Sequence, residues 1–150
     1  ETCDTSFGCE EVSGDSCASP QLNDIDGVEA NRWGWYLESF FDGTAQEFTF
    51  DMYAGAGQNV LANGVNAGNV VVTVNADDGS SSYDVHPADG YCFDDIHVHV
   101  GNDYPTLTKK GVTTTSVAPG QYTQANTLAH GAFYIIVHVG DTCTPCEPEL

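Results

Sequence analysis

The residues of this sequence best suited to chemistry are three histidines in two similar strings, IHVHVG and IIVHVG. His97 and His99 stand in the first string and His138 in the second. If both strings are β-strands, alternate side chains share a face, so His97 and His99 lie together and the aliphatic residues between them face the core. A third imidazole from a neighbouring strand would complete a set that can hold Zn²⁺ or Cu²⁺ with an open position. The alternative is that these imidazoles lie on a half-wetted sheet face and hydrogen-bond to nearby carboxylates.

A second candidate site contains three acidic residues, Asp24, Asp26 and Glu29. The spacing begins like a calcium-binding EF-hand loop, but Val28 and Trp35 occupy positions that must supply oxygen ligands. The EF-hand interpretation therefore fails. A calcium site of another kind, built from these three carboxylates and backbone carbonyls, remains a prediction, and an ordinary Asx-rich turn is its alternative.

Six cysteines, an even number gathered toward the two ends of the chain, predict a disulfide framework formed outside the cytosol. Their pairing stays open. The last two have the CxxC spacing of redox sites, but they follow the last predicted strand instead of opening a helix, so we expect a structural role. The cysteines are Cys3, Cys9, Cys17, Cys92, Cys143 and Cys146.

The charge of the chain excludes several classes of partner. Among 150 residues, 22 acidic side chains face only Arg32, Lys109 and Lys110, which gives a net charge of −19. Such a surface repels the phosphates of nucleic acids and of anionic membranes and favours divalent cations. No apolar run approaches the length of a membrane span, and the sequence begins with Glu1. We therefore expect a secreted, mature extracellular or cell-surface protein that does not insert into membranes.

The elements that must position these residues are short β-strands. Alternating apolar residues in RWGWYLE and EFTFDMY and the β-branched run NVVVTVN predict strands, joined by hairpin turns at Asp42-Gly43 and Asp78-Gly79. AFYIIVHVG is the most apolar segment and is predicted to be central and covered on both faces. Trp33 and Trp35 are expected in the core, whereas Tyr36 is predicted to contact a sugar or a neighbouring subunit.

These patterns predict the fold class and the domain organisation. Residues 1–22 show no periodicity and are expected to form an irregular cysteine-rich arm, followed by one domain over residues 23–150. Seven or eight short strands with frequent turn signals and no helical segment indicate an all-β, antiparallel β-sandwich of the jelly-roll or immunoglobulin-like type. Disulfides are expected to stabilise it.

Five motifs in a fixed order resemble a β-sandwich module found in exported proteins of aquatic bacteria, over about residues 17–143. No activity is attached to that module. Cys17, His97 and His138 fall on its positions, whereas His99 stands where it has an aromatic residue and Asn59 where it has a cysteine, which implies different disulfides. The motifs are RWGW, FxFDxYAGAGQ, HxxVG, APGQY and YIIVH.

We interpret the chain as a non-catalytic secreted structural protein, a self-assembling subunit of an extracellular fibre or surface layer that binds copies of itself and requires no cofactor. Neither a GxSxG nucleophile nor a phosphate-binding loop is present in the sequence. One alternative is an extracellular module that binds calcium or a glycan. The other is a histidine-based zinc or copper enzyme.

Overall fold

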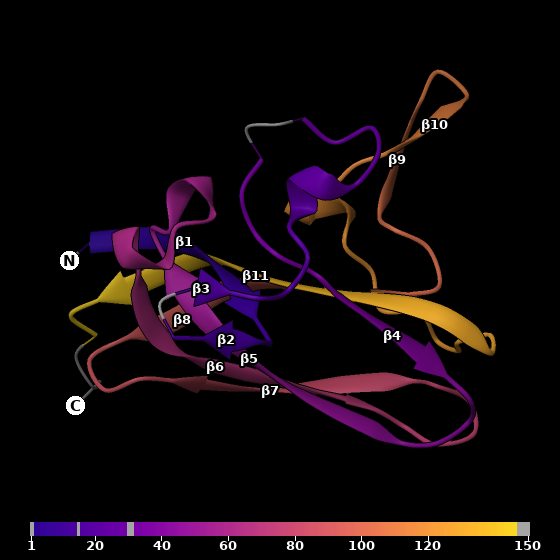
Figure 1. The fold of residues 1–150 in the computed structure, drawn as a ribbon, viewed down its shortest axis with the longest axis horizontal. Helices are drawn as coiled ribbons and strands as arrows, with labels where there is room; N and C mark the ends of the chain where they lie inside the picture. Colours follow the sequence, from indigo (N-terminus) through magenta and orange to yellow (C-terminus); the bar gives the residue numbers. More distant parts are fainter. Residues whose placement is uncertain (1, 15, 30–31, 147–150) are drawn as a thin grey trace.

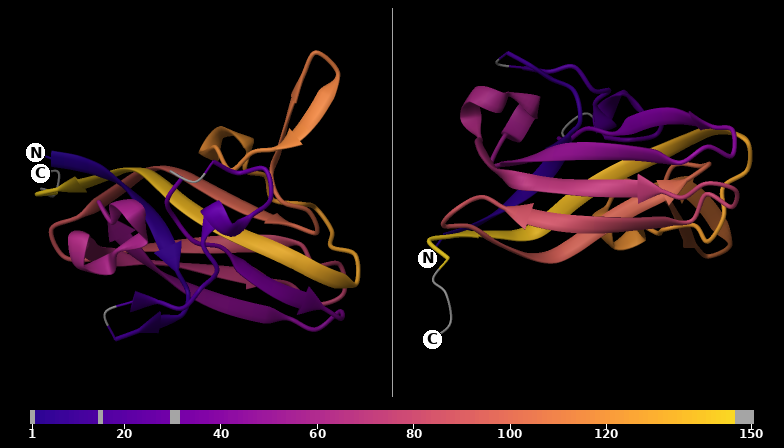
Figure 2. Two further views of the ribbon diagram at one scale, coloured as in Figure 1. Left: turned by 45° about the horizontal axis from the view of Figure 1, so that its top comes forward. Right: turned by 90° about the horizontal axis from the view of Figure 1, so that it is seen from below.

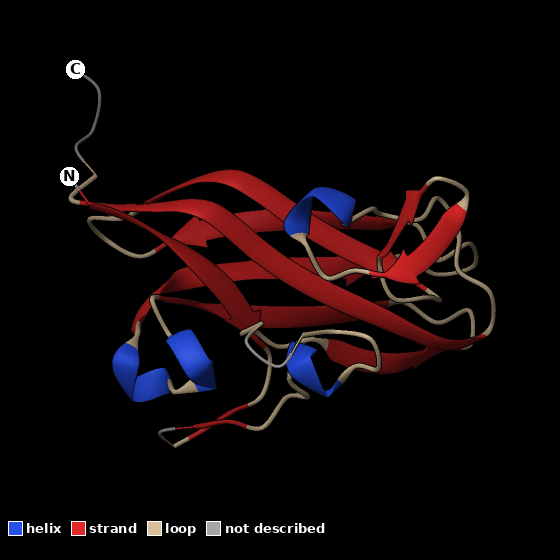
Figure 3. Ribbon diagram, turned by 90° about the horizontal axis from the view of Figure 1, so that it is seen from above, coloured by secondary structure: helices blue, strands red, loops and turns tan. Residues whose placement is uncertain are grey.

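The computed structural model describes residues 2–14, 16–29 and 32–146. Within these ranges the strands pair with one another in antiparallel fashion, which confirms the predicted all-β, antiparallel class, and a sandwich fits the arrangement. Figure 3 shows the strands forming most of the molecule, with the short 3-10 helices lying against them. The elements are β1 (Thr2–Cys9), β2 (Val12–Ser13), β3 (Ser16–Cys17), η1 (Leu22–Asp24), β4 (Leu37–Phe41), β5 (Gln46–Ala54), η2 (Gly57–Asn59), η3 (Leu61–Asn63), β6 (Val65–Val74), β7 (Ser81–Pro87), β8 (Cys92–Gly101), β9 (Thr106–Lys109), β10 (Val112–Thr115), η4 (Pro119–Gln121) and β11 (Gly131–Thr144).

The main sheet is organised around β11, the longest strand. On one side β11 pairs with β8, and on the other it pairs first with β4 and then with β1. From β1 the sheet continues through β5 and β6 to β7, and it curls until β7 comes close to β8. β11 therefore lies in one layer, and β5, β6 and β7 form the layer opposite it (Figure 1). Figure 2 shows the same layers from two further directions.

An aliphatic and aromatic core fills the space between the two layers. Its side chains alternate along each strand, as the pleat of a β-strand requires. Val98 and Val100 of β8 and Ile135, Val137 and Val139 of β11 are all buried there, which confirms the predicted core face of both histidine strings. The opposite layer contributes Phe50, Met52, Val70, Val72 and Val74.

A second apolar cluster covers the outer face of β11 and β1. Ile136 on β11 and Phe7 on β1 pack there against Leu22, Trp35 and Leu61, which come from the segments that precede β4 and β6. β11 is therefore buried on both faces in its central part, as its apolar sequence predicts. His138, the one histidine of the second string, lies on this outer face, beneath irregular segments instead of a second sheet.

Within residues 1–22, which were predicted to form an irregular N-terminal arm, Thr2–Cys9 is instead a strand of the main sheet. β1 lies between β11 and β5, and its second half is buried. Small residues explain why periodicity missed it: a Cβ on Gly8 would lie 2.7 Å from the Cβ of Phe50, so only glycine fits there. Ser6 and Thr142 share a buried hydrogen bond between their hydroxyls of 2.8 Å, which satisfies polar groups that would otherwise be costly to bury.

The two predicted hairpin turns have different outcomes. Asp78-Gly79 does join an antiparallel pair, β6 and β7. Asp42-Gly43 does not, because β4 pairs with β11 while β5 pairs with β1 and β6. The described residues form eleven strands, more than the seven or eight predicted. β1 and two small hairpins, β2–β3 and β9–β10, come from segments that were expected to be irregular.

Candidate functional site

The register of β8 and β11 brings two of the three histidines together. His97 lies directly opposite His138, and their ring centroids are 5.5 Å apart. His99 lies opposite Ile136 instead. The Nε2 atom of His97 is 3.0 Å from a carboxylate oxygen of Asp95. The strands therefore form a pair of imidazoles with one adjacent carboxylate.

His99 is excluded from that group by its own hydrogen bonds. Its Nε2 atom lies 2.8 Å from the backbone oxygen of Asp103, and its Nδ1 atom accepts the backbone N–H of Thr123 at 3.3 Å. Nε2 must therefore carry the proton and donate it to Asp103. Burial lowers the pKa of His99, so the ring is neutral and ties two loops to β8. The predicted convergence of three imidazoles is wrong because both nitrogens of His99 are already occupied.

His138 is also buried, but one of its ring nitrogens lacks a hydrogen-bond partner among the described residues. Its exposed fraction is 7%, and within the described part of the chain its buried Nδ1 atom has no hydrogen-bond partner. Burial, followed by the neighbouring His97, lowers the pKa of His138 to about 4, while Asp95 acts in the opposite direction. His138 is consequently a neutral imidazole at physiological pH, packed 4.7 Å from the ring of Phe7 between centroids.

The acidic residues of the second candidate site do not form a cluster. In residues 2–14, 16–29 and 32–146, no three His, Cys, Asp or Glu side chains gather in a group that could hold a metal ion. Asp24 accepts the backbone N–H of Gln21 at 3.3 Å and caps η1, which is a structural task. Asp26 and Glu29 are exposed. Calcium binding stays a prediction.

The cysteines form three disulfides, as the composition predicts. Cys143 and Cys146 bond to different partners and not to each other, which gives the CxxC spacing a structural role. Two of the bonds fasten the end of β11 and the residues just after it to β1 on one side and to β8 on the other. All three are consistent with an oxidising compartment outside the cytoplasm. None of the helices in the described ranges has the length and apolar character that crossing a bilayer requires. The pairs are Cys3–Cys143, Cys9–Cys17 and Cys92–Cys146.

Tyr36 is not the exposed contact residue that alternation predicts. Its exposed fraction is 9%, and its ring packs against Tyr104 and Tyr134. The hydroxyl of Tyr104 donates a hydrogen bond of 3.4 Å to the Tyr36 hydroxyl. Both Trp35 and Tyr36 are buried because this segment is covered on both sides, so strict alternation between core and solvent does not apply to it.

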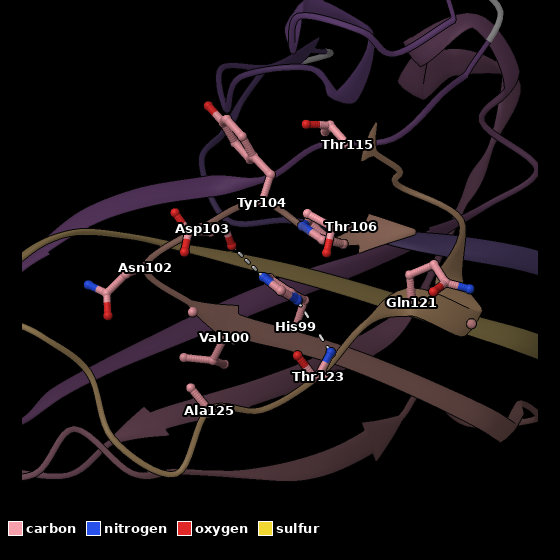
Figure 4. A pocket seen from close by; sticks show the side chains of 13 residues that line it. His99, Val100, Asn102, Asp103, Tyr104, Thr106, Thr115, Gln121, Thr123 and Ala125 are labelled. Carbon is pink, nitrogen blue, oxygen red and sulfur yellow. Dashed lines mark hydrogen bonds between the residues drawn. The ribbon is translucent and has the colours of Figure 1, made fainter. Parts of the chain in front are cut away.

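A cavity of about 690 Å³ opens where the β9–β10 hairpin leaves the body. Figure 4 shows His99 between Asp103 and Thr123, with Tyr104, Thr106 and Thr115 on the side of the hairpin. Burial raises the pKa of Tyr104 to about 12, so its hydroxyl stays protonated. The wall offers hydroxyls and amides but no cation, and its histidine is already bonded on both nitrogens.

A second cavity, of about 420 Å³, lies on the outer face of the sheet, and His138 forms part of its wall. Arg32, Glu29, Trp33 and Phe7 also line it. Sequence reasoning assigned Trp33 to the core and gave Arg32 no role. The only available signal was that the sole arginine of the chain adjoins a tryptophan.

The β9–β10 hairpin is the third feature that sequence reasoning missed. Among the strands of the described ranges, β9 and β10 pair only with each other, and their residues are largely exposed, with Val112 62% exposed. Lys109 and Lys110, both lysines of the chain, stand at its turn. Figures 1 and 2 show it projecting from the body, away from the end where both termini lie. The string KKG between two threonine-rich runs was the signal for this turn.

The end that contains the termini is acidic. Asp94 and Asp141 are exposed and directly opposite each other in the β8–β11 ladder, and Asp4 is exposed on the adjacent β1. Asp89 is exposed in the turn that leads into β8. Like charges placed directly opposite on neighbouring strands repel each other. The molecule therefore has an acidic end and a projecting basic tip.

Comparison with protein-family models, with curated proteins and with solved structures found no significant match. Function must therefore be inferred from the charges, contacts and shape of the molecule itself.

Proposed function

We propose that this protein is a non-catalytic secreted structural subunit, and that its copies associate into an extracellular fibre or surface layer through the β9–β10 hairpin. One observation carries the proposal: both lysines of a chain with a net charge of −19 lie at the turn of a hairpin that projects from the body. The hairpin contributes nothing to the main sheet, so its projection needs another explanation, and an interaction surface supplies one.

Charge decides which surface the hairpin can bind. Without the two lysines, the rest of the chain has 22 acidic side chains against Arg32 alone. Two such bodies repel each other, whereas the ammonium groups of one hairpin attract the body of the next copy. Because the tip stands away from its own body, it can reach a neighbour while the bodies remain apart. The projecting tip thus reduces the charge problem that any assembly of this chain faces.

The acidic end is the surface on which the tip of a neighbour would be most stabilised. Asp94 and Asp141 repel each other there, and an ammonium group placed between them would offset that repulsion. The tip and the acidic end lie toward opposite ends of the molecule (Figure 1). A contact between different surfaces of successive copies does not close on itself unless the rotation closes a ring, so it can propagate as a filament.

The disulfides support the same role. Cys3–Cys143 and Cys92–Cys146 fasten β1, β11 and β8 together beside the acidic surface. An acceptor surface held by covalent bonds loses little conformational freedom when a partner binds, which favours association.

Electron microscopy and sedimentation of the purified protein test the proposal. We expect assemblies at about 0.01 M salt that dissociate at about 1 M, because the Debye length falls from roughly 30 Å to roughly 3 Å. Lys109→Glu with Lys110→Glu should abolish assembly, whereas arginine at both positions should preserve it. Adding Asp94→Lys and Asp141→Lys to the glutamate variant should restore assembly, because the hairpin is then acidic and the surface that it binds is basic.

Monodisperse monomers under every ionic condition would refute the proposal. So would assemblies that a chelator dissolves but the glutamate variant retains, because a divalent cation and not the hairpin would then join the copies.

A further inference from the structure

We infer that the cavity lined by Arg32 and Trp33 is a binding site for a neutral sugar ring, as found in an uncharged oligosaccharide. This site lies on the outer face of β1 and β11 and does not include the β9–β10 hairpin. Its volume of about 420 Å³ falls within the roughly 300–1,000 Å³ range of small-molecule sites. The inference is independent of self-assembly.

One wall of the cavity consists of aromatic rings that hold one another in place. Phe7 meets Trp33 edge to face with centroids 4.9 Å apart, and it also contacts the imidazole of His138. Trp33 in turn contacts the buried Trp35, with centroids 6.0 Å apart. Trp33 is only partly buried, so its ring is fixed from behind and accessible from the cavity. A fixed, accessible indole is a surface on which the C–H face of a sugar ring can pack.

The backbone is built to place Trp33 there. Gly34 has φ of 123°, and a Cβ at this position would lie 2.8 Å from both the Leu22 side chain and the Phe7 ring. The Gly34 N–H donates a hydrogen bond of 2.6 Å to the side chain of Asn59, whose amide donates another of 3.1 Å to Gln21. This segment therefore packs closely on β1 and is anchored by side chains outside the cavity, so the cavity wall is formed before a ligand arrives.

The polar groups of the cavity are one cation and one anion. Glu29 and Arg32 both line the cavity and are exposed, and no ion pair joins them. Within the part of the chain that the structure describes, the Arg32 guanidinium has no hydrogen-bond or ion-pair partner. The guanidinium can donate to sugar hydroxyls and the carboxylate can accept from them. Both groups are thus available to a ligand.

The charge of the site selects a neutral ligand. The charges of Arg32 and Glu29 cancel, so the cavity has no net attraction for either sign. An anionic sugar would also experience the field of a protein with a net charge of −19. The buried His138 is neutral, because burial lowers its pKa, and adds no cation to the wall. A ring with one apolar face and uncharged hydroxyls satisfies all of these groups at once.

Calorimetric titration and tryptophan fluorescence with a panel of neutral oligosaccharides test the inference. The panel contains oligomers of glucose, galactose, mannose, xylose and N-acetylglucosamine, and an oligomer of galacturonic acid serves as the charged comparison. We expect at least one neutral oligomer to bind and to change the fluorescence of Trp33, and the acidic oligomer to bind at least about tenfold more weakly, a difference that corresponds to 1.4 kcal/mol. Failure of every neutral oligomer to bind, or tighter binding of the acidic one, would overturn the inference.

Three variants locate the binding in this cavity. Trp33→Ala should weaken it at least about tenfold, and Arg32→Gln, an exposed position at which the fold is not at risk, should do the same. Phe40→Ala is the matched control, because Phe40 is 65% exposed on β4 and does not line the cavity. The glutamate variants of Lys109 and Lys110 should bind sugar like the wild type whether or not they assemble. Binding that survives both cavity variants would place the sugar elsewhere and reject this site.

Discussion

The two ends of the β8–β11 ladder are held by different forces. Near the termini, two disulfides join β11 to its neighbours beside the opposed carboxylates of Asp94 and Asp141, and the adjacent His138 is buried with an unpaired nitrogen. Near the hairpin, the disulfides of the described chain are absent, and His99 ties two loops to β8 through hydrogen bonds on both ring nitrogens.

This difference shows how the chain distributes its stability. Covalent bonds are placed where like charges repel and where a polar group is buried at a cost. At the hairpin end, hydrogen bonds from the buried, neutral ring of His99 keep the loops that carry the projecting hairpin in position. The end near the termini should therefore depend strongly on oxidation and on pH. The hairpin end should depend on pH alone, because burial lowers the pKa of His99 as well.

The largest expected effect on stability follows from removing the disulfide that closes the longest loop of the chain. Cys3–Cys143 closes a sequence separation of 140 residues and Cys9–Cys17 a separation of 8. Chain entropy predicts that replacing the first pair by serine lowers the free energy of unfolding by about 4–5 kcal/mol and the second by about 2.5 kcal/mol. Urea denaturation of the two double-serine variants measures both values. An equal or reversed order would mean that the termini are held mainly by packing.

A pH-dependent loss of stability should come next, and it should depend on His138. The pKa of His138 is about 4 in the folded protein because of burial, against roughly 6.5 in an unfolded chain. As the pH falls through this window, the unfolded state binds the proton first, so the free energy of unfolding falls, by up to about 3 kcal/mol. Carboxylates titrate in part of the same range. Urea denaturation at several pH values should therefore be compared between the wild type and His138→Met, in which this part of the slope should vanish. Replacing His86, which is exposed on β7, by Gln is the control and should leave this difference between the wild type and His138→Met intact.

The same substitution at the other buried histidine tests the comparison directly. His99→Met leaves the Asp103 carbonyl and the Thr123 N–H without their partner, which should cost about 1–3 kcal/mol at neutral pH. His138→Met removes no hydrogen bond from the Nδ1 atom and should cost less. Thermal or urea unfolding of the two variants at pH 7 measures the difference. If His138→Met proves the more damaging, hydrogen bonding is not what distinguishes the two rings.

The sequence was sufficient for the fold class and for the faces of the strands with strong alternation. Val98 and Val137 lie in the core because period-two patterning directly reports which side of a sheet is apolar. Periodicity failed to predict β1. Its glycine and serine residues fit because they pack closely against Phe50 and Thr142, and such packing depends on residues distant in the chain. Alternation also failed for Tyr36, because its ring is covered both by Tyr134 of β11 and by Tyr104 of the segment between β8 and β9.

The candidate sites were harder to predict than the core. Period two correctly placed His97 and His99 on one face of a strand, but the register that sets His97 opposite His138, and the loops that occupy His99, arise from tertiary structure. The cavity beside Arg32 likewise combines four separate regions of the sequence, which are β1, the segment before β4, the segment of Val117 and Pro119, and β11. The projecting hairpin was encoded locally, in a lysine-glycine turn between threonine runs, and a search for such turns would have found it.

The smallest expected effect separates the stability of one subunit from its assembly. Asp94 is exposed opposite Asp141, and its carboxylate accepts the Asp95 N–H at 2.9 Å. Asp94→Asn keeps an acceptor for that bond while removing the repulsion, so the free energy of unfolding should rise by roughly 0.2–1 kcal/mol. Assembly at low salt should weaken at the same time, because the acceptor for the lysine tip loses charge. Asp84→Asn, on the exposed side of β7 opposite Val71, is the matched control and should change neither quantity. A subunit that becomes more stable and assembles less would show that the acidic end sacrifices its own stability for contact with the next copy. A variant that becomes more stable and assembles equally well would show that the two opposed carboxylates only repel each other within the subunit and do not belong to the interface between copies.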